Sequence, residues 1–248
     1  MTEIVAIINI TPDSFSDGRK NATTEDYLAL IQQAIEEGAT ILDIGAESTR
    51  PGATLLTQEE EWKRLKPILQ QIKSKAILSI DTRYPQTFRD AIEYGAQWFN
   101  DISGLQNVES TKLAAECKCD VVLMHSLTVP ADPKITFSEG TNVVQAVLDW
   151  AEKRIAELKL PKDKIIFDPG IGFGKTAAQC WELIENIAQF KTLGVRLMVG
   201  HSRKSFLGLP MEQRDAATAE ITRKLAQAGV DYVRVHNVKA NHQVIISA

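Results

Sequence analysis

The sequence predicts a single (β/α)₈ barrel domain over residues 1–248, and two observations predict it. Short apolar runs alternate with amphipathic stretches, which is typical of parallel strands joined by right-handed helical crossovers. The alternation repeats eight times at about 31 residues a unit (248 divided by 8), with no Pro/Gly/Ser-rich linker between units. A closed barrel usually needs about 250 residues, although one large domain or two small ones would fit this length. Eight units without a linker favour the closed barrel over the alternative of an open doubly wound sheet.

Four of the expected strands share a local pattern. A Gly ends a helix-like stretch, a small or β-branched residue follows, and an apolar run comes next. A Gly in this place supplies the left-handed residue that ends many helices, and the apolar run is typical of a strand buried on both faces. These segments are 38–44, 95–101, 194–200 and 229–235. Apolar runs at 4–10, 76–80, 121–124 and 164–167 bring the expected strands to eight.

The stretches between strands predict helices. In residues 24–37, Leu28, Ile31 and Ile35 recur at helical spacing. Residues 57–71 open with Thr57 and Glu60, three apart, which is the pattern of a capping box. Equally periodic segments predict helices at 141–158, 177–190 and 214–228, and residues 238–247 are expected to form a short closing helix.

The composition is that of an average globular protein and excludes several classes. Hydrophobic residues make up 44%, charged residues 24%, and the formal net charge is −4. No apolar run approaches the ~18 residues of a membrane span, and the N-terminus, with Glu3, does not fit a signal peptide. We therefore expect a cytoplasmic protein without membrane or nucleic-acid partners. The odd number of cysteines, Cys117, Cys119 and Cys180, predicts free thiols in a reducing compartment.

Every expected strand is followed by a polar side chain. In a barrel of this kind the C-terminal ends of the strands meet at one rim, where the chemistry takes place. One Asp or Asn at a strand end could equally form a turn, but eight together indicate a site. In chain order they are Asn9, Asp43, Asp81, Asn100, His125, Asp168, Ser202 and His236. Carboxylates and amides of this set can read the hydrogen-bonding edge of a heterocycle.

Basic residues gather at the same rim although the chain is acidic overall. Arg50 follows the second expected strand, and Arg203 and Lys204 follow the seventh. Arg234 and His236 lie two residues apart and therefore share one face of the eighth strand. These cations predict a pocket for an anionic substrate, above all a phosphate, with solvated surface charges as the alternative.

Other common catalytic patterns are incomplete. No G-x-S-x-G, H-E-x-x-H or paired C-x-x-C motif is present, which argues against a hydrolase elbow and a structural zinc site. A zinc site formed by His125, His201 and His236, from three different units, is left open. In the Gly-rich segment 168–176, Pro169 stands where a Walker loop needs Gly, so the segment favours an anion site or the close approach of a flat ligand.

Seven segments, in the same order, resemble the dihydropteroate synthases of the pterin-binding family. They are residues 9–18, 43–52, 79–82, 100–104, 168–176, 202–205 and 234–236, so the resemblance covers nearly the whole chain. It implies a (β/α)₈ barrel and a transferase of folate biosynthesis. The expected reaction joins 6-hydroxymethyl-7,8-dihydropterin diphosphate to 4-aminobenzoate and releases diphosphate. The resemblance also implies Mg²⁺ as cofactor, inhibition by sulfonamides, a homodimer, and two loops (9–18 and 43–52) that close over the substrates.

The resemblance implies roles for individual residues as well. The expected pterin-binding residues are Asp81, Asn100, Met124, Asp168, Gly200 and Lys204. The expected diphosphate-binding residues are Asn9, Thr49, Arg234 and His236, with Asn9 as the Mg²⁺ ligand. For 4-aminobenzoate they are Thr49, Pro51, Phe173, Lys204 and Ser202, with Ser202 at a helix N-terminus. The expected catalytic residues are Asp81, Lys204 and Arg50.

Two alternatives to a synthase remain at this point. A methyltransferase domain of the methyltetrahydrofolate–corrinoid type would share the Asp and Asn contacts to a pterin, but it has no use for a diphosphate-binding pair such as Arg234 and His236. A non-catalytic pterin-binding paralogue should have lost loop residues, yet Asn9, Thr49 and Arg50 are all present.

Overall fold

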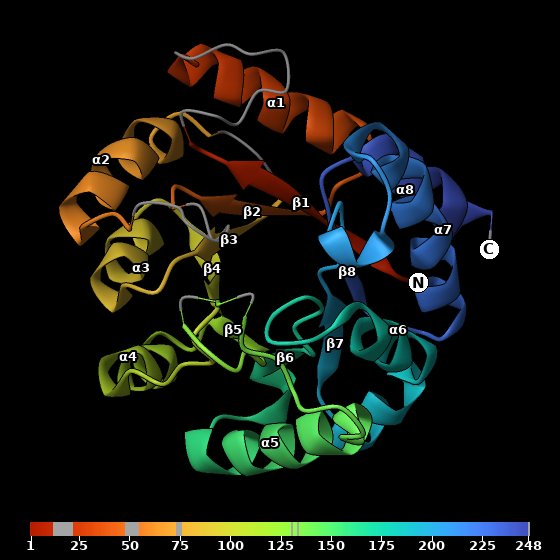
Figure 1. Cartoon of the computed structure of the whole chain (residues 1–248). Coiled ribbons are helices and arrows are strands. Elements are labelled where there is room, and N and C mark those ends of the chain that lie inside the picture. The colour runs from red at the N-terminus through yellow and green to blue at the C-terminus, as the bar shows by residue number, and fades with distance from the viewer. Residues whose placement is uncertain (12–21, 48–54, 73–75, 130, 133, 248) are drawn as a thin grey trace.

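Eight parallel strands close into a barrel in chain order, with β8 pairing back to β1. The computed structural model describes residues 1–11, 22–47, 55–72, 76–129, 131–132 and 134–247. The strands are β1 (Glu3–Asn9), β2 (Ile41–Gly45), β3 (Ile77–Asp81), β4 (Ala96–Asp101), β5 (Asp120–Met124), β6 (Ile165–Asp168), β7 (Arg196–Val199) and β8 (Tyr232–Val235). Helices surround this barrel on the outside (Figure 1), so the predicted (β/α)₈ fold is confirmed.

A helix follows each strand along the chain. The helices are α1 (Thr24–Glu36), α2 (Gln58–Leu69), α3 (Pro85–Ile92), α4 (Val108–Cys117), α5 (Val143–Leu158), α6 (Ala177–Glu185), α7 (Arg214–Gln227) and α8 (Val238–Ile246). The capping box predicted for α2 is present, because Thr57 accepts from the Glu60 amide while the Glu60 carboxylate accepts from the Thr57 amide. Among the described helices, none is long and apolar enough to cross a membrane.

Short 3₁₀ segments account for one difference from the prediction. They are η1 (Lys162–Lys164), η2 (Ile187–Leu193), η3 (Ser205–Leu207) and η4 (Met211–Gln213). The helix expected over 177–190 ends at Glu185, and η2 follows it. The side-chain amide of Asn186 donates to the Glu182 carbonyl at 2.9 Å. The Asn186 backbone amide donates to the same carbonyl at 3.1 Å. An Asn side chain bonded to the backbone in this way favours a helix end over a helix interior.

Helices α3 and α4 were not predicted individually. Helix α3 has only eight residues and begins with a proline, which is also a turn signal. Helix α4 buries only Ser110, Leu113 and Ala114, so its apolar face is short. Weak local patterns of this kind are completed by packing against the barrel rather than by helix propensity.

The hydrophobic residues form two separate cores. The larger one lies between the strands and the helices. The smaller one fills the inside of the barrel and consists of Val5, Ile41, Trp98, Val122, Ile166, Met198 and Tyr232, with Ile77 packed against it. Because side chains alternate along a strand, the residue two positions after each of these points into the barrel as well, closer to the C-terminal rim. This alternation positions the polar site.

Candidate active site

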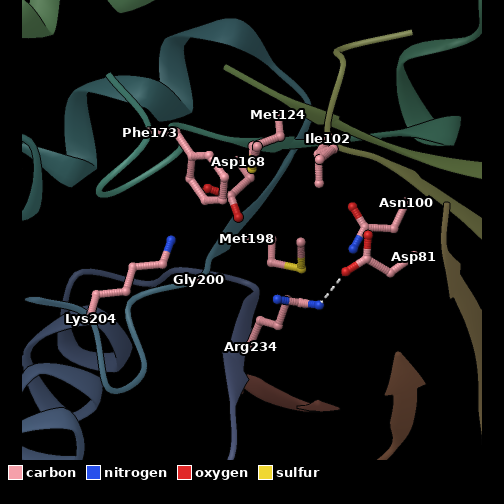
Figure 2. A pocket seen from close by; sticks show the side chains of 10 residues that line it. All are labelled: Asp81, Asn100, Ile102, Met124, Asp168, Phe173, Met198, Gly200, Lys204 and Arg234. Atoms are coloured by element: carbon pink, nitrogen blue, oxygen red, sulfur yellow. Dashed lines mark hydrogen bonds and ion pairs between the residues drawn. The ribbon is translucent and has the colours of Figure 1, made fainter. Parts of the chain in front are cut away.

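A pocket opens at the C-terminal ends of the strands, directly above the inner apolar core. Its lining residues come from six strands or the turns that follow them: Asp81, Asn100, Ile102, Met124, Asp168, Phe173, Met198, Gly200, Lys204 and Arg234. Figure 2 shows these side chains facing a common space. All six residues expected to bind a pterin lie in this lining, together with Phe173 and Arg234. The predicted convergence of distant strand ends is therefore present.

Arg234 lies at one side of the pocket between two carboxylates. Its Nε donates to Asp43 Oδ2 at 2.5 Å, and its Nη2 donates to Asp81 Oδ2 at 2.6 Å. The second bond is the dashed line in Figure 2. The arginine side chain is 21% exposed, whereas Asp43 is 1% exposed. The guanidinium charge is thus held in place and largely balanced before any ligand binds.

Asp43 is the centre of this network, and sequence reasoning placed it at the rim without giving it a role. It accepts from the Ser79 hydroxyl at 2.5 Å and from the Asn100 side-chain amide at 3.0 Å, in addition to Arg234. The sequence feature that could have indicated this role is a carboxylate inside the otherwise apolar run Ile41–Gly45. Asp43 orients Asn100 and Arg234 through these bonds, and both of those residues face the pocket.

The carboxyl group of Asp81 has an unusual acidity. Burial raises its pKa to about 7, Arg234 opposes this shift, and the neighbouring charge of Asp43 adds to it. A carboxyl group that changes its charge near neutral pH, in a pocket, is a common feature of functional sites.

Asp168 is a buried carboxylate at the end of β6. One of its oxygens accepts from the Gly170 amide at 2.7 Å, and burial raises the pKa of the group although Lys204 opposes this. A Cβ atom on Gly200 would lie 3.3 Å from the other oxygen, Asp168 Oδ2. Glycine at position 200 therefore leaves space beside that oxygen, which suits a flat ligand.

Lys204 and Phe173 meet at the opposite side of the pocket. The Lys204 ammonium lies 4.4 Å from the centre of the Phe173 ring, and it donates to the Ile171 carbonyl. Burial lowers the pKa of Lys204 to about 8, while Asp168 opposes the shift. The lysine is therefore mainly charged at neutral pH, and its contacts connect the turn after β7 to the loop after β6.

Ser202 and His236 contact each other. The Ser202 hydroxyl lies 3.0 Å from His236 Nδ1 and accepts from the His236 backbone amide at 3.1 Å. The placement of Ser202 at a helix N-terminus was wrong, because it lies in a turn and the nearest helix, η3, begins only at Ser205. The tight turn at Arg203, with a φ of 57°, separates the two. Neither residue belongs to the pocket lining, although they follow the C-terminal ends of β7 and β8.

The remaining predicted site residues belong to the segment that follows β2 or to the end of β1. Thr49, Arg50 and Pro51 are outside the described residues. Asn9 is the last residue of β1. It is in register with Gly45 on β2, and Gly45 is in register with Asp81 on β3. Because Val5 points into the barrel, Asn9 points inward as well.

The possible three-histidine zinc site is not supported. His125 lies 2.8 Å from Lys175, and His201 lies close to the Thr218 carbonyl and the Thr222 hydroxyl, at 3.1 and 3.0 Å. Burial lowers the pKa of His125 to about 3 and that of His201 to about 4. In the described part of the chain, no three His, Cys, Asp or Glu side chains are grouped so that they could hold a metal ion.

Comparison with known proteins identifies the family. The model of the family described as "Pterin binding enzyme" matches residues 5–236. The chain belongs to the pterin-binding enzyme family. A dihydropteroate synthase from Streptococcus pyogenes is 36% identical over 251 residues, with 98% of this chain and 92% of that protein covered. The expectation that the chain is a member of this family is confirmed.

Solved structures of pterin-binding enzymes share the fold. A dihydropteroate synthase from Anaplasma phagocytophilum with bound 6-hydroxymethylpterin-monophosphate has a TM-score of 0.90 and 33% identity, covering 99% of this chain and 97% of that chain. A Xanthomonas albilineans dihydropteroate synthase with 4-aminobenzoic acid has a TM-score of 0.90 and 34% identity, covering 99% and 91%. The chain spans only 29% to 59% of the length of four other relatives, whose names describe bifunctional proteins.

Proposed function

We propose that this chain is a dihydropteroate synthase. It transfers the pterinylmethyl group of 6-hydroxymethyl-7,8-dihydropterin diphosphate to the amine of 4-aminobenzoate and releases diphosphate. The observation that carries the proposal is the pocket itself, in which a buried carboxylate, an amide and a lysine surround one narrow space. The Streptococcus relative is named for this activity, and the two solved structures contain a pterin phosphate and 4-aminobenzoic acid.

Asp168 and Asn100 recognise the pterin ring. A pterin presents two N–H donors side by side, and the Asp168 oxygen next to Gly200 can accept from them. The Asn100 amide nitrogen donates to Asp43. This bond turns its oxygen toward the pocket, where it can accept from a further ring N–H. Met124 supplies the apolar wall of the slot.

The charged groups act on the bond that breaks. Departure of diphosphate leaves positive charge on the pterin methylene carbon, and the carboxylate of Asp81 stabilises that charge. Arg234 and His236 bind the anion at the rim. The amine of 4-aminobenzoate is neutral near pH 7, so it attacks without a strong general base, and its proton leaves to solvent after the new C–N bond forms. The catalytic contribution is positioning and charge stabilisation.

The 4-aminobenzoate ring packs against Phe173, and Lys204 lies above the same phenyl ring. Lys204 binds the pterin on one side and 4-aminobenzoate on the other, which places the two substrates next to each other. Thr49, Pro51 and Ser202 complete the second site in this proposal, and Arg50 is a catalytic residue.

Asn9 fits the proposed Mg²⁺ site. Its amide oxygen is a ligand that Mg²⁺ accepts, and it lies at the level of Asp81 in the barrel. Mg²⁺ usually takes one or two protein oxygens together with water and substrate phosphate, so a single amide suits it better than a closed cage. The ion would supply charge neutralisation for the diphosphate. The homodimer and the cytoplasmic location remain predictions.

The decisive experiment is a product assay. The protein is mixed with the dihydropterin diphosphate, 4-aminobenzoate and Mg²⁺, and both diphosphate and 7,8-dihydropteroate are measured, with Asp168→Asn as the matched inactive control. We expect equal amounts of the two products, and neither product when 4-aminobenzoate is left out. Pterin binding without product formation would favour a non-catalytic binding protein, and methyl transfer from methyltetrahydrofolate would favour the corrinoid-linked class.

A further inference from the structure

Lys175 is a buried cation that the proposed mechanism does not use. It lies between the loop after β6 and helix α6, and only 7% of the residue is exposed. Its Nζ donates to the Phe173 carbonyl at 2.9 Å and lies 2.8 Å from His125 Nδ1. Burial lowers its pKa to about 7, and the negative charge of Asp168 opposes the shift. Burying a lysine without a carboxylate in hydrogen-bond contact lowers the stability of the protein. A lysine in such a place therefore indicates a functional role for its two contacts.

His125 is held so that it presents an acceptor to Lys175. The ring is 2% exposed and lies between Phe137, stacked at 5.6 Å, and Trp150, which meets it edge-on at 4.9 Å. Burial and the neighbouring lysine lower its pKa, so the ring is neutral at pH 7. Nδ1 faces a donor and is therefore the unprotonated nitrogen. The aromatic contacts prevent the ring from turning away.

The loop that Lys175 contacts is pressed closely onto the end of β5. The His125 amide donates to the Asp168 carbonyl at 3.0 Å. At Gly170, where φ is +68°, a Cβ atom would lie 1.8 Å from the His125 carbonyl oxygen. The Phe173 amide donates to the Gly170 carbonyl at 3.0 Å. This turn brings the Phe173 carbonyl inward to Lys175 while its ring faces the pocket.

Phe173 is thus held from two sides. The Lys204 ammonium lies over its ring, and Lys175 binds its carbonyl on the buried side. Lys175 is not part of the pocket lining, so it reaches a ligand only through the residues it holds. Phe173 is half-buried, so burial alone does not enclose its side chain, and the contact of its carbonyl with Lys175 is a second point at which the residue is held.

We propose that Lys175, oriented by His125, is a positioning residue that fixes Phe173 and thereby the wall on which 4-aminobenzoate packs. The inference rests on the proposed function for the identity of the ligand. It predicts a selective effect, because in the described part of the chain Lys175 hydrogen-bonds to Phe173 and His125 and not to Asp168 or Asn100, which act on the pterin directly.

The first test is Lys175→Met, which keeps most of the length of the side chain but removes the amino group that makes both hydrogen bonds. The KM for 4-aminobenzoate should rise about tenfold, while kcat and the dissociation constant of the dihydropterin diphosphate change by less than about threefold. Equal losses for both substrates, or an unchanged KM in a folded variant, would overturn the proposal.

A matched pair at position 125 separates positioning from packing. Asn and Leu have nearly the same shape, and both lose the imidazole ring. Only Asn keeps an acceptor near the place of Nδ1. His125→Leu should therefore raise the KM for 4-aminobenzoate as Lys175→Met does, and His125→Asn should restore most of the loss. Identical behaviour of the two variants would mean that the ring only fills space. This pair also serves if Lys175→Met does not fold.

Two further measurements test whether Lys175 acts through Phe173 and whether it holds the loop when no activity is measured. In a Phe173→Ala background, Lys175→Met should cause no additional rise in KM, because the phenyl ring through which Lys175 acts is gone. Hydrogen exchange of the amides at 170–174 should be faster in Lys175→Met than in the wild type. If the wild type makes no dihydropteroate, the proposed function fails, whereas the exchange experiment still tests whether Lys175 holds this loop; unchanged exchange would contradict that.

Discussion

The inside of the barrel contains two layers of side chains with opposite character, supplied by the same strands. The lower layer is apolar: Val5, Ile41, Trp98, Val122, Ile166, Met198 and Tyr232. Two residues further along, four of these strands contribute Asp43, Asn100, Asp168 and Arg234 to the upper layer. Both layers are largely buried, yet Trp98 and Tyr232 pack edge to face at 4.9 Å below, whereas Arg234 bridges two carboxylates above.

Residues two positions apart on the same strand therefore have different roles: the lower one contributes to stability and the upper one to function. Removing apolar surface from water stabilises the fold, so the lower layer contributes to the free energy of unfolding. Burying charges is costly, and pairing them only offsets that cost. The upper layer is therefore arranged for a ligand rather than for stability. Substitutions in the lower layer should therefore change the free energy of unfolding, and substitutions in the upper layer should change ligand binding.

The largest effect is expected for Asp168→Ala in the upper layer. The two pterin N–H donors lose their acceptor, at about 1–3 kcal/mol for each unsatisfied group, so pterin binding should weaken by roughly 2–6 kcal/mol. Isothermal titration with the dihydropterin diphosphate measures this loss. Ile166→Val, two residues earlier on β6, is the control and should leave the affinity unchanged. If the Asp168→Ala variant binds as the wild type does, the upper layer does not read the pterin.

Trp98→Ala tests the lower layer. The side chain is 2% exposed, and its removal should lower the free energy of unfolding by about 3–5 kcal/mol through lost burial and a cavity. Urea unfolding gives the value, and the pterin affinity of the folded fraction gives the contrast. A stable Trp98→Ala protein that cannot bind pterin would show that the two layers are not separate.

Arg234→Ala should distinguish the two parts of the pterin substrate. A lost charged hydrogen bond to the diphosphate costs about 1.5–3 kcal/mol. The affinity for the diphosphate should therefore fall by that amount relative to the affinity for a pterin without phosphate. Calorimetry with both ligands measures the difference. Equal losses would mean that Arg234 acts only by holding Asp43 and Asp81.

The smallest predicted effect is on the pH dependence of kcat/KM. Asp81 must be ionised to stabilise positive charge, and its pKa is raised to about 7, so activity should fall as the pH drops below that value. Lys204 must be protonated, and its pKa is lowered to about 8, so activity should fall again above that pH. One pH unit outside this range the rate should drop about tenfold. Asp43→Asn removes a like charge and should move the acidic limb to lower pH.

Features that depend on residues close together in the sequence were predicted most reliably. The strands, most helices and the Thr57 capping box follow from local periodicity and spacing, and α3 and α4 were missed where those patterns are short. The strand-end rule also indicated that Asp81, Asn100 and Asp168 lie close together, because every parallel strand of a barrel ends at the same rim. It could not reveal what each side chain contacts there.

The amino-acid sequence by itself determined the barrel, the rim and the types of group that line it, since periodicity, caps and strand ends are local properties of the chain. The tertiary structure alone decided which groups meet: Asp43 with Arg234 across 191 positions, and Lys175 with His125 across 50. Contacts between distant residues depend on barrel closure, side-chain rotamers and the loss of water on burial. These same features move the pKa values of Asp81 and Lys204 toward neutrality.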